Sequence, residues 1–284
     1  MSRRNSGRTK GPQEEAEASG APAPAPTSND VFSFVTPTEF VELPSKGLYY
    51  NEDHPLHDCD VVEIRHMTAR EEDILTSETL LKSGMALNRL LQSVLVDKRL
   101  HPDSLLIGDK NAVLIATRQT GFGDEYTTTI NCNGCGHSNE KQFSLSSKTI
   151  KESNIPEGVT LLENGNFMYH NDDYDLELEL HLLNGRDETR ITKILEKSKK
   201  LKTEARSITT MLESIIVSVN DIKDSGAIRQ VVSAMPVKLS RKLRSVYEEV
   251  MPNVGIYADF ECDSCPHAEK LEVPISINFF WPDA

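Results

Sequence analysis

The chain has 284 residues, of which 38% are hydrophobic and 26% charged, and its formal net charge is −13. This length allows one large or two small domains, and no stretch approaches the roughly 18 apolar residues of a membrane span. The acidic balance disfavours nonspecific binding to nucleic acid, and five cysteines are too few for a disulfide-stapled secreted domain. We therefore expect folding in a reducing cytoplasm, with no membrane partner and no nucleic-acid ligand.

The chain is predicted to contain three segments. Residues 1–30 form a disordered Pro/Ala-rich tail, because Ala21-Pro-Ala-Pro-Ala-Pro26 is an extended polyproline-like spacer with polar flanks. Residues 31–154 and 155–284 are predicted to be two α+β halves, each of which carries one Cys-x-x-Cys pair.

The first half begins with alternating residues from Val61 to Met67, which predict a strand. Thr68 with Glu71 three residues later is a capping-box pattern, so a helix is expected to begin here. The apolar stripe from Leu87 to Leu95 predicts an amphipathic helix, and Asp109 is expected to cap another short helix.

The first Cys-x-x-Cys pair, Cys132-Asn-Gly-Cys135, lies between predicted strands at 126–132 and 142–145. In the second half, alternation over 176–182 predicts another strand. Apolar stripes over 208–219 and 239–250 predict two helices.

The second pair, Cys262-Asp-Ser-Cys265, is also flanked by β-like segments, and residues 273–281 are predicted to form a final strand. That strand is apolar on both faces near its end, so it must be covered. Either its own domain or a neighbouring subunit could cover it, and Phe279 to Trp281 is a candidate partner contact.

The run from Lys197 to Lys202 is basic within an acidic protein. A solvated helix face and a contact for an acidic partner are the two interpretations of this run.

Four thiols in two Cys-x-x-Cys turns predict a metal site. Each turn places two thiolates on one side of a tight knuckle, and two knuckles supply four soft ligands in the tetrahedral geometry that suits Zn²⁺. The predicted zinc ligands are Cys132, Cys135, Cys262 and Cys265. Such a site is closed, with four protein ligands and no water, and is therefore structural.

Three questions about this site stay open at the level of sequence. Thiol–disulfide exchange would place the pair at a helix N-terminus, whereas both pairs here lie between strands. His137 and His267 follow the two pairs, and either could replace a cysteine as ligand. Gly136 supplies the backbone freedom that the first knuckle turn needs, whereas the second knuckle has Pro266 at this position, so its geometry is the third question. The fifth cysteine, Cys59, is expected to be a free thiol.

The two halves resemble each other. Tyr126–Cys132 aligns with Ile256–Cys262, and the apolar positions coincide at equal distances from the first cysteine. Weaker matches relate 48–53 to 167–173 and 69–72 to 185–188. The predicted fold is therefore α+β, with two similar halves from a diverged internal duplication. Each half has strands, helices and a CxxC hairpin, and a shared zinc-ribbon-like site joins the two.

Catalytic motifs are missing from the sequence. It has no GxSxG, no GxxxxGK[ST] and no HExxH, and its acidic residues are scattered. We therefore expect a protein that is not an enzyme.

Several segments together resemble the T4-type bacteriophage baseplate protein family. They are Leu43-Pro-Ser-Lys-Gly47-Leu-Tyr-Tyr50, Met67-Thr-Ala-Arg-Glu-Glu72, Leu106-Ile-Gly-Asp109-Lys-Asn, Gly121-Phe-Gly123-Asp-Glu-Tyr126, the first CxxC-Gly-His and Phe279-Phe-Trp-Pro282. The resemblance covers roughly residues 35 to 284. The family includes baseplate hub subunits and a hub assembly factor of contractile tails, and it offers no catalytic residue to carry over.

The resemblance implies a structural or assembly component of a phage baseplate hub. Such a component would bind other tail proteins, be present in the host cytoplasm during assembly and then enter the virion tail. The alternative is a soluble zinc-ribbon enzyme or a nucleic-acid-associated factor.

Overall fold

The structure, a computed structural model, describes residues 36–201, 206–273, 275 and 277–280. These residues belong to one unit that spans Thr36–Ala284. The predicted tail, 1–30, lies outside the described residues.

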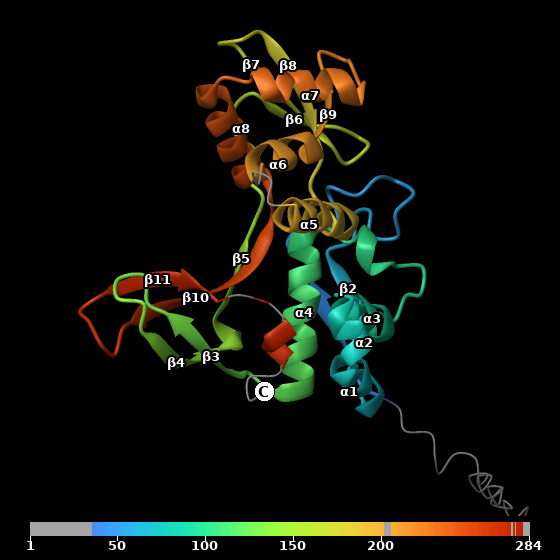
Figure 1. Ribbon diagram of the computed structural model, residues 1–284. Coiled ribbons are helices and arrows are strands. Elements are labelled where there is room, and N and C mark those ends of the chain that lie inside the picture. The colour runs from blue at the N-terminus through green and yellow to red at the C-terminus, as the bar shows by residue number, and fades with distance from the viewer. Residues whose placement is uncertain (1–35, 202–205, 274, 276, 281–284) are drawn as a thin grey trace, which may run out of the picture. The chain divides into compact units, whose positions relative to one another are not determined.

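The first half combines short strands with helices (Figure 1). Its elements are β1 (Thr38–Glu42), β2 (Val61–Arg65), α1 (Ala69–Thr76), α2 (Glu78–Lys82), α3 (Ala86–Val94), η2 (Pro102–Ser104), α4 (Ile107–Phe122), β3 (Glu125–Asn131), β4 (Ser138–Ser144), η3 (Leu145–Ser147) and β5 (Lys148–Lys151).

The second half starts with a meander of short strands. Its elements are β6 (Val159–Leu161), β7 (Phe167–Asn171), β8 (Leu176–Leu180), α5 (Gly185–Lys200), α6 (Ser207–Ile215), β9 (Ile216–Val219), α7 (Ser225–Ala234), α8 (Val237–Val250), β10 (Asn253–Glu261), β11 (Ala268–Glu272) and η4 (Ile277–Phe280). The structure is therefore a mixed α and β fold.

Three predicted elements of the first half are confirmed. β2 begins at Val61 and pairs with β1 in antiparallel register. Thr68 and Glu71 form the predicted capping box at the start of α1. The predicted apolar stripe becomes α3, which buries Leu90, Leu91 and Val94 in the core.

The prediction of a short helix capped by Asp109 is wrong. α4 has 16 residues, and Leu106 is its N-cap residue. Asp109 lies in the first turn and is fully buried, where it accepts hydrogen bonds from the Ser45 hydroxyl (2.6 Å) and the Tyr50 hydroxyl (2.8 Å). This carboxyl group fastens the 43–60 segment to α4, so its neighbours are long-range and give no local sequence signal.

The segment 43–60 contains turns and no strand. Lys46, Gly47 and Asp58 have positive φ angles. A Cβ atom on Gly47 would lie 2.3 Å from the backbone nitrogen of Cys59, so the chain can pass this closely only at glycine. The two segments that were predicted to match therefore differ in structure, because 48–53 contains turns whereas 167–173 contains strand β7.

The predicted helix over 208–219 ends early. α6 stops at Ile215, and Ile216–Val219 form strand β9, which pairs with β8. Apolar residues at 215, 216 and 219 fit both helical and strand spacing, and pairing with β8 decides between them. The predicted helix over 239–250 is confirmed as α8.

The halves are joined by strand pairing. β5 is the last strand before residue 155, yet it pairs with β10 of the second half, and β10 continues into a pairing with β11. α4 also packs against β10. These contacts place the two Cys-x-x-Cys hairpins in one region of the molecule (Figure 1).

The predicted final strand over 273–281 is wrong for the residues that can be described. Ile277–Phe280 form a 3₁₀ helix, and the Phe279 and Phe280 side chains are buried. Phe279 contacts Tyr126 edge to face, and the guanidinium of Arg118 donates a 3.0 Å hydrogen bond to its carbonyl oxygen. The chain's own domain therefore covers both phenylalanines, and Trp281 lies outside the described residues.

Within the part of the chain that is described, no helix is long and apolar enough to cross a lipid bilayer.

Candidate metal centre

The first knuckle lies at the tip of the β3–β4 hairpin. Seven residue pairs align the two strands, from Glu125 with Ser144 to Asn131 with Ser138. The backbone N–H of Cys132 donates to the carbonyl oxygen of His137 at 2.8 Å, and the N–H of Gly136 donates to the carbonyl oxygen of Cys132 at 2.8 Å. Gly136 has φ +73°, which supplies the left-handed residue that this turn requires.

The second knuckle has the same closure at the tip of the β10–β11 hairpin. The N–H of Cys262 donates to the carbonyl oxygen of His267 at 3.0 Å. In both knuckles, the N–H two residues after the first cysteine points at that cysteine's sulfur. The Gly134 nitrogen is 3.3 Å from the Cys132 sulfur, and the Ser264 nitrogen is 3.4 Å from the Cys262 sulfur.

The structure brings the four predicted ligands together. All four Sγ atoms lie within 4.8 Å of one another, and two sulfur pairs that join one hairpin to the other are each 3.7 Å apart. Those close pairs are Cys132 with Cys265 and Cys135 with Cys262.

These separations fit a tetrahedral zinc site. A Zn–S bond is about 2.3 Å long, and the edge of a regular tetrahedron is about 1.63 times its centre-to-vertex distance, so neighbouring sulfurs in a Zn(Cys)₄ centre lie about 3.8 Å apart. The 3.7 Å pairs match this spacing, and they are much too long for a disulfide bond of about 2.05 Å. The donor set is also of the soft, anionic kind that zinc prefers.

The electrostatics of the cluster also favour a cation. The N–H of Ser264 is the main cause that lowers the pKa of Cys262 to about 6. The pKa of Cys265 is raised to about 12, because the neighbouring thiols and burial outweigh the favourable N–H of His267. Four thiolates at this spacing repel one another, so all four can ionise together only around a positive charge.

Asn139 is a site residue that the sequence did not reveal. Its side chain is 1% exposed, and its amide nitrogen donates to the carbonyl oxygen of His137 at 2.9 Å. Its amide oxygen accepts the backbone N–H of Asp263 at 2.8 Å. One side chain on β4 therefore holds both knuckles.

Further polar contacts join the hairpins at the surface. Lys141 and Asp263 form a 2.6 Å ion pair, and the Asn133 amide donates to Glu269 at 2.9 Å. A Cβ atom added at Gly134 would lie 3.2 Å from His267, so the second position after Cys132 has little room for a side chain.

The remaining candidate ligands lie elsewhere. Within the described residues, the cluster consists of the four thiols, and neither His137 nor His267 belongs to it. His137 is exposed, and the Nε2 atom of His267 is 3.3 Å from a Glu269 carboxylate oxygen. Cys59 is half-buried, and its sulfur donates to the carbonyl oxygen of Pro55.

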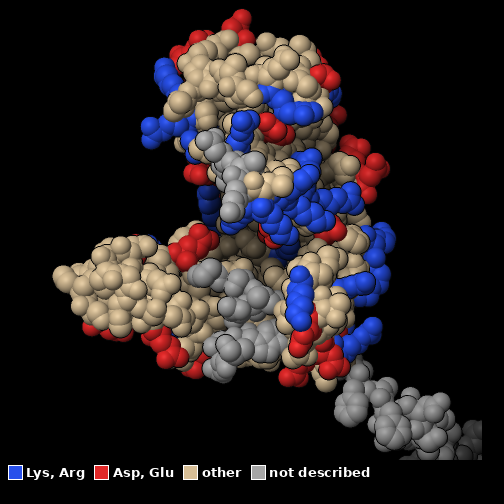
Figure 2. Space-filling view, in the orientation of Figure 1, with Lys and Arg blue, Asp and Glu red and all other residues tan. Residues whose placement is uncertain are grey.

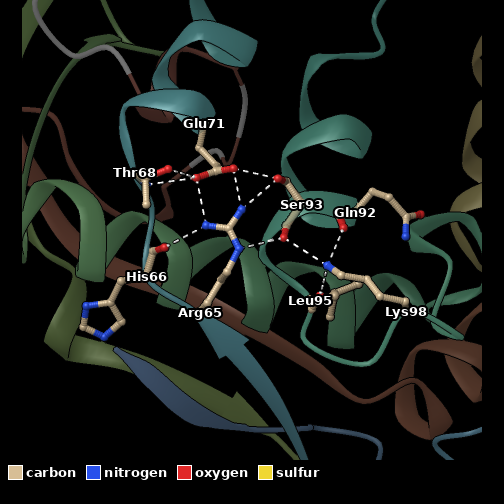
Figure 3. Close-up of polar contacts among 8 residues, drawn as sticks. All are labelled: Arg65, His66, Thr68, Glu71, Gln92, Ser93, Leu95 and Lys98. Carbon is tan, nitrogen blue, oxygen red and sulfur yellow. Dashed lines mark hydrogen bonds and ion pairs between the residues drawn. The ribbon is translucent and has the colours of Figure 1, made fainter. Parts of the chain in front are cut away.

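A second polar cluster surrounds Arg65 and Glu71 (Figure 3). Two guanidinium nitrogens of Arg65 contact the two Glu71 oxygens at 3.0 and 2.6 Å, and Ser93 donates to Glu71 at 2.6 Å. Burial alone would raise the pKa of Glu71, but these donors and Thr68 outweigh it and hold the pKa at about 2.

This cluster lies beside a hollow of about 410 Å³ whose charged lining residues are all cations. All five N–H groups of Arg65 are already used, by Glu71, Ser93 and the carbonyl oxygens of Ser93 and His66. Lys98 donates to three carbonyl oxygens at the end of α3. Arg65 and Lys98 therefore have no donor left for a ligand, and their contacts hold the end of α3 against β2 and α1.

Comparison with known proteins identifies a family. No curated protein and no solved structure matches the chain. The family model described as "T4 bacteriophage base plate protein" matches residues 36–281, which is most of the chain and includes both knuckles. The chain therefore belongs to the T4 bacteriophage base plate protein family.

Proposed function

We propose that this protein is a structural or assembly component of the baseplate hub of a contractile-tailed phage, and that it acts by binding other tail proteins. The family match over residues 36–281 carries this proposal. We propose further that the protein catalyses no reaction of its own. It would be present in the host cytoplasm during assembly and would then become part of the virion tail.

The proposal includes one structural Zn²⁺ held by four cysteines. Support comes from the 3.7 Å sulfur pairs between the hairpins and from the N–H groups directed at Cys132 and Cys262. A metal with four protein ligands has no open position for substrate or water. Its effect would be to fasten β3–β4 to β10–β11, and so to fix one half of the chain against the other.

We further propose that the two halves arose by duplication. The α1 capping box of Thr68 and Glu71 has a counterpart at the start of α5, where Asn184 and Asp187 form the same reciprocal pair. The strands that lead into these helices, β2 and β8, each form an antiparallel hairpin with the strand before them.

A second set of matching contacts supports the same proposal. Ile64 of β2 bridges to Leu95, which directly follows α3, and Leu180 of β8 pairs with Ile216, which directly follows α6. Both helices have nine residues.

The polar contacts made by the ends of α3 and α6 also correspond. Arg65 donates to the carbonyl oxygen of Ser93, and a His181 ring nitrogen lies 2.6 Å from the carbonyl oxygen of Ser214. His181 also lies 3.8 Å from Asp187, as Arg65 lies beside Glu71. A basic side chain, an acidic side chain near it and a serine carbonyl that contacts the basic side chain therefore recur 116 to 121 positions later in the chain.

Quantitative mass spectrometry of purified virions and of isolated baseplates tests the function. The proposal predicts that the protein is present in fixed proportion to other baseplate proteins, either in finished virions or in assembly intermediates. Absence from both would contradict it. Turnover of a substrate by the purified protein, or tight binding to DNA, would instead support the enzyme or nucleic-acid alternative.

A further inference from the structure

Helix α5 presents an exposed, basic and partly apolar stripe. Of its 16 residues, only Gly185 and Asp187 in the first turn are buried. α5 packs against α4, α6 and η2, and Ile191 lies against the core on that side. Most other residues of the helix are exposed.

Part of the exposed surface of α5 combines cations with apolar side chains. With 3.6 residues per turn, one sector of about 120° contains six such exposed residues, together with Arg190, and no acidic residue. We call these six the α5 stripe, and they are Arg186, Lys193, Ile194, Lys197, Lys200 and the C-cap residue Leu201. Figure 2 shows the corresponding blue side chains gathered over α5, in the middle of the view.

The cations of the stripe, unlike their neighbours, form no ion pair with a residue that the structure describes. Glu188 and Glu196 of α5 lie outside the sector, and Glu188 is paired with Lys110 at 2.7 Å. Arg190 lies within the same sector, but it is paired with Asp187 at 3.0 Å. Within the described part of the chain, none of the four stripe cations has an ion pair. Among the described residues, positive charge without an ion pair is thus concentrated on α5, in a protein whose net charge is −13.

Two large apolar side chains interrupt the charge. Ile194 is 43% exposed and Leu201 is 63% exposed, and they lie seven residues apart on the same side of the helix. Phosphate backbones offer no apolar surface for such residues. A membrane-bound amphipathic helix needs a broad apolar face, whereas the other apolar side of α5 is turned toward its own domain.

We infer that the α5 stripe is a docking surface for an acidic segment of another tail protein, whose carboxylates pair with the lysines and whose apolar residues contact Ile194 and Leu201. This inference rests on the proposed function, in which the chain acts by binding neighbouring proteins. Complementary charge of this kind speeds encounter and fixes orientation, while the apolar contacts slow dissociation.

The first test uses a labelled 15-residue peptide with glutamates and two leucines spaced seven residues apart on one helical face. Binding to the full chain is measured by fluorescence anisotropy. The stripe variant is K193Q/K197Q/K200Q, because glutamine removes charge while it keeps helix propensity. The matched control is R229Q/R241Q/K242Q, which removes the same charge from exposed positions on α7 and α8.

The expected result is a Kd at least tenfold higher for the stripe variant, less than twofold higher for the control, and weaker binding at higher salt. Equal weakening by both variants, or tighter binding of duplex DNA or of anionic phospholipid vesicles than of the peptide, would overturn the inference. Circular dichroism verifies that the helix content is unchanged. The single variant K197Q, with an expected twofold to fourfold effect, decides the matter if the triple variant is unfolded.

The second test is incorporation into baseplates. If wild-type protein enters baseplates and the folded stripe variant enters them equally well, the inference fails while the proposed function stands. If wild-type protein enters no baseplate or assembly intermediate, the proposed function fails, and the peptide experiment alone decides whether the stripe binds acidic segments.

Discussion

The amide oxygen of Asn139 accepts the backbone N–H of Asp263 at 2.8 Å, so a side chain on one hairpin closes the turn of the other. The two residues are 124 positions apart in sequence. The same amide donates to the carbonyl oxygen of His137 in its own knuckle. The two knuckles are therefore aligned by protein contacts as well as by their sulfurs.

Replacing Asn139 by leucine should destabilise the junction of the hairpins. The substitution leaves the backbone N–H of Asp263 without its partner, and the carbonyl oxygen of His137 keeps only the N–H of Cys132. The loss of such a partner typically costs about 1–3 kcal/mol when the group is buried, and less where it is partly exposed. We expect unfolding at lower urea concentration and faster transfer of zinc to a competing chelator. Asn133→Ala, at an exposed position with one surface contact, is the control and should change both by little. Wild-type zinc transfer in Asn139→Leu would contradict the role assigned to this amide.

Replacing Glu71 by glutamine should lower stability at neutral pH. The pKa of Glu71 is held at about 2, below the ordinary 4.5. The depressed pKa corresponds to roughly 3 kcal/mol of folding free energy, fully present above pH 4.5 and lost as the pH falls toward 2. Urea unfolding of Glu71→Gln should show a loss of this order at pH 7 and a smaller loss at pH 3. The exposed neighbour variant Glu72→Gln serves as control, and equal losses at both pH values would contradict the assignment.

Replacing Cys262 by serine should release the metal and loosen the hairpins. Metal binding contributes to folding when its ligands converge only in the folded chain. We expect less zinc per chain, a lower melting temperature and faster amide exchange in β10–β11, with the helices of each half largely intact. Cys59→Ser, outside the cluster, should keep its zinc. A Cys262→Ser protein that melts like wild type and keeps its zinc would rule out the shared site.

Replacing Phe280 by alanine should destabilise the fold itself. The side chain is 1% exposed and contacts Phe122 and Phe279. Removal of a buried phenylalanine costs about 3–5 kcal/mol, whereas Phe40, which is 69% exposed, should cost much less on the same change. Urea unfolding of the two variants compares these costs. If Phe280→Ala were as stable as wild type but failed to enter baseplates, Phe280 would be a contact for a partner protein and not a core residue.

Local patterns in the sequence were sufficient for much of the fold. The α1 capping box and the α8 stripe each depend on residues within a few turns of one another, so short-range spacing identifies them. The Cys-x-x-Cys pairs likewise predicted the cluster of four thiols that the structure shows, because a knuckle is a local structure.

Long-range contacts decided the rest. Ile216 could continue α6, but its pairing with Leu180 makes it a strand residue. The alternation of apolar residues in the C-terminal segment predicted a strand. In the structure Phe279 belongs to a 3₁₀ helix, where it contacts Arg118 and Tyr126 from distant parts of the chain. In the sequence, Asn139 is like any polar residue of an exposed hairpin, because its partner Asp263 lies on the other hairpin.

Zinc K-edge X-ray absorption, combined with elemental analysis of protein purified without added metal, tests the central claim most directly. The account predicts one zinc per chain, surrounded by four sulfurs at about 2.3 Å. A protein without zinc, an iron chromophore, or a zinc shell that contains nitrogen or oxygen ligands would contradict a Zn(Cys)₄ centre shared by the two hairpins.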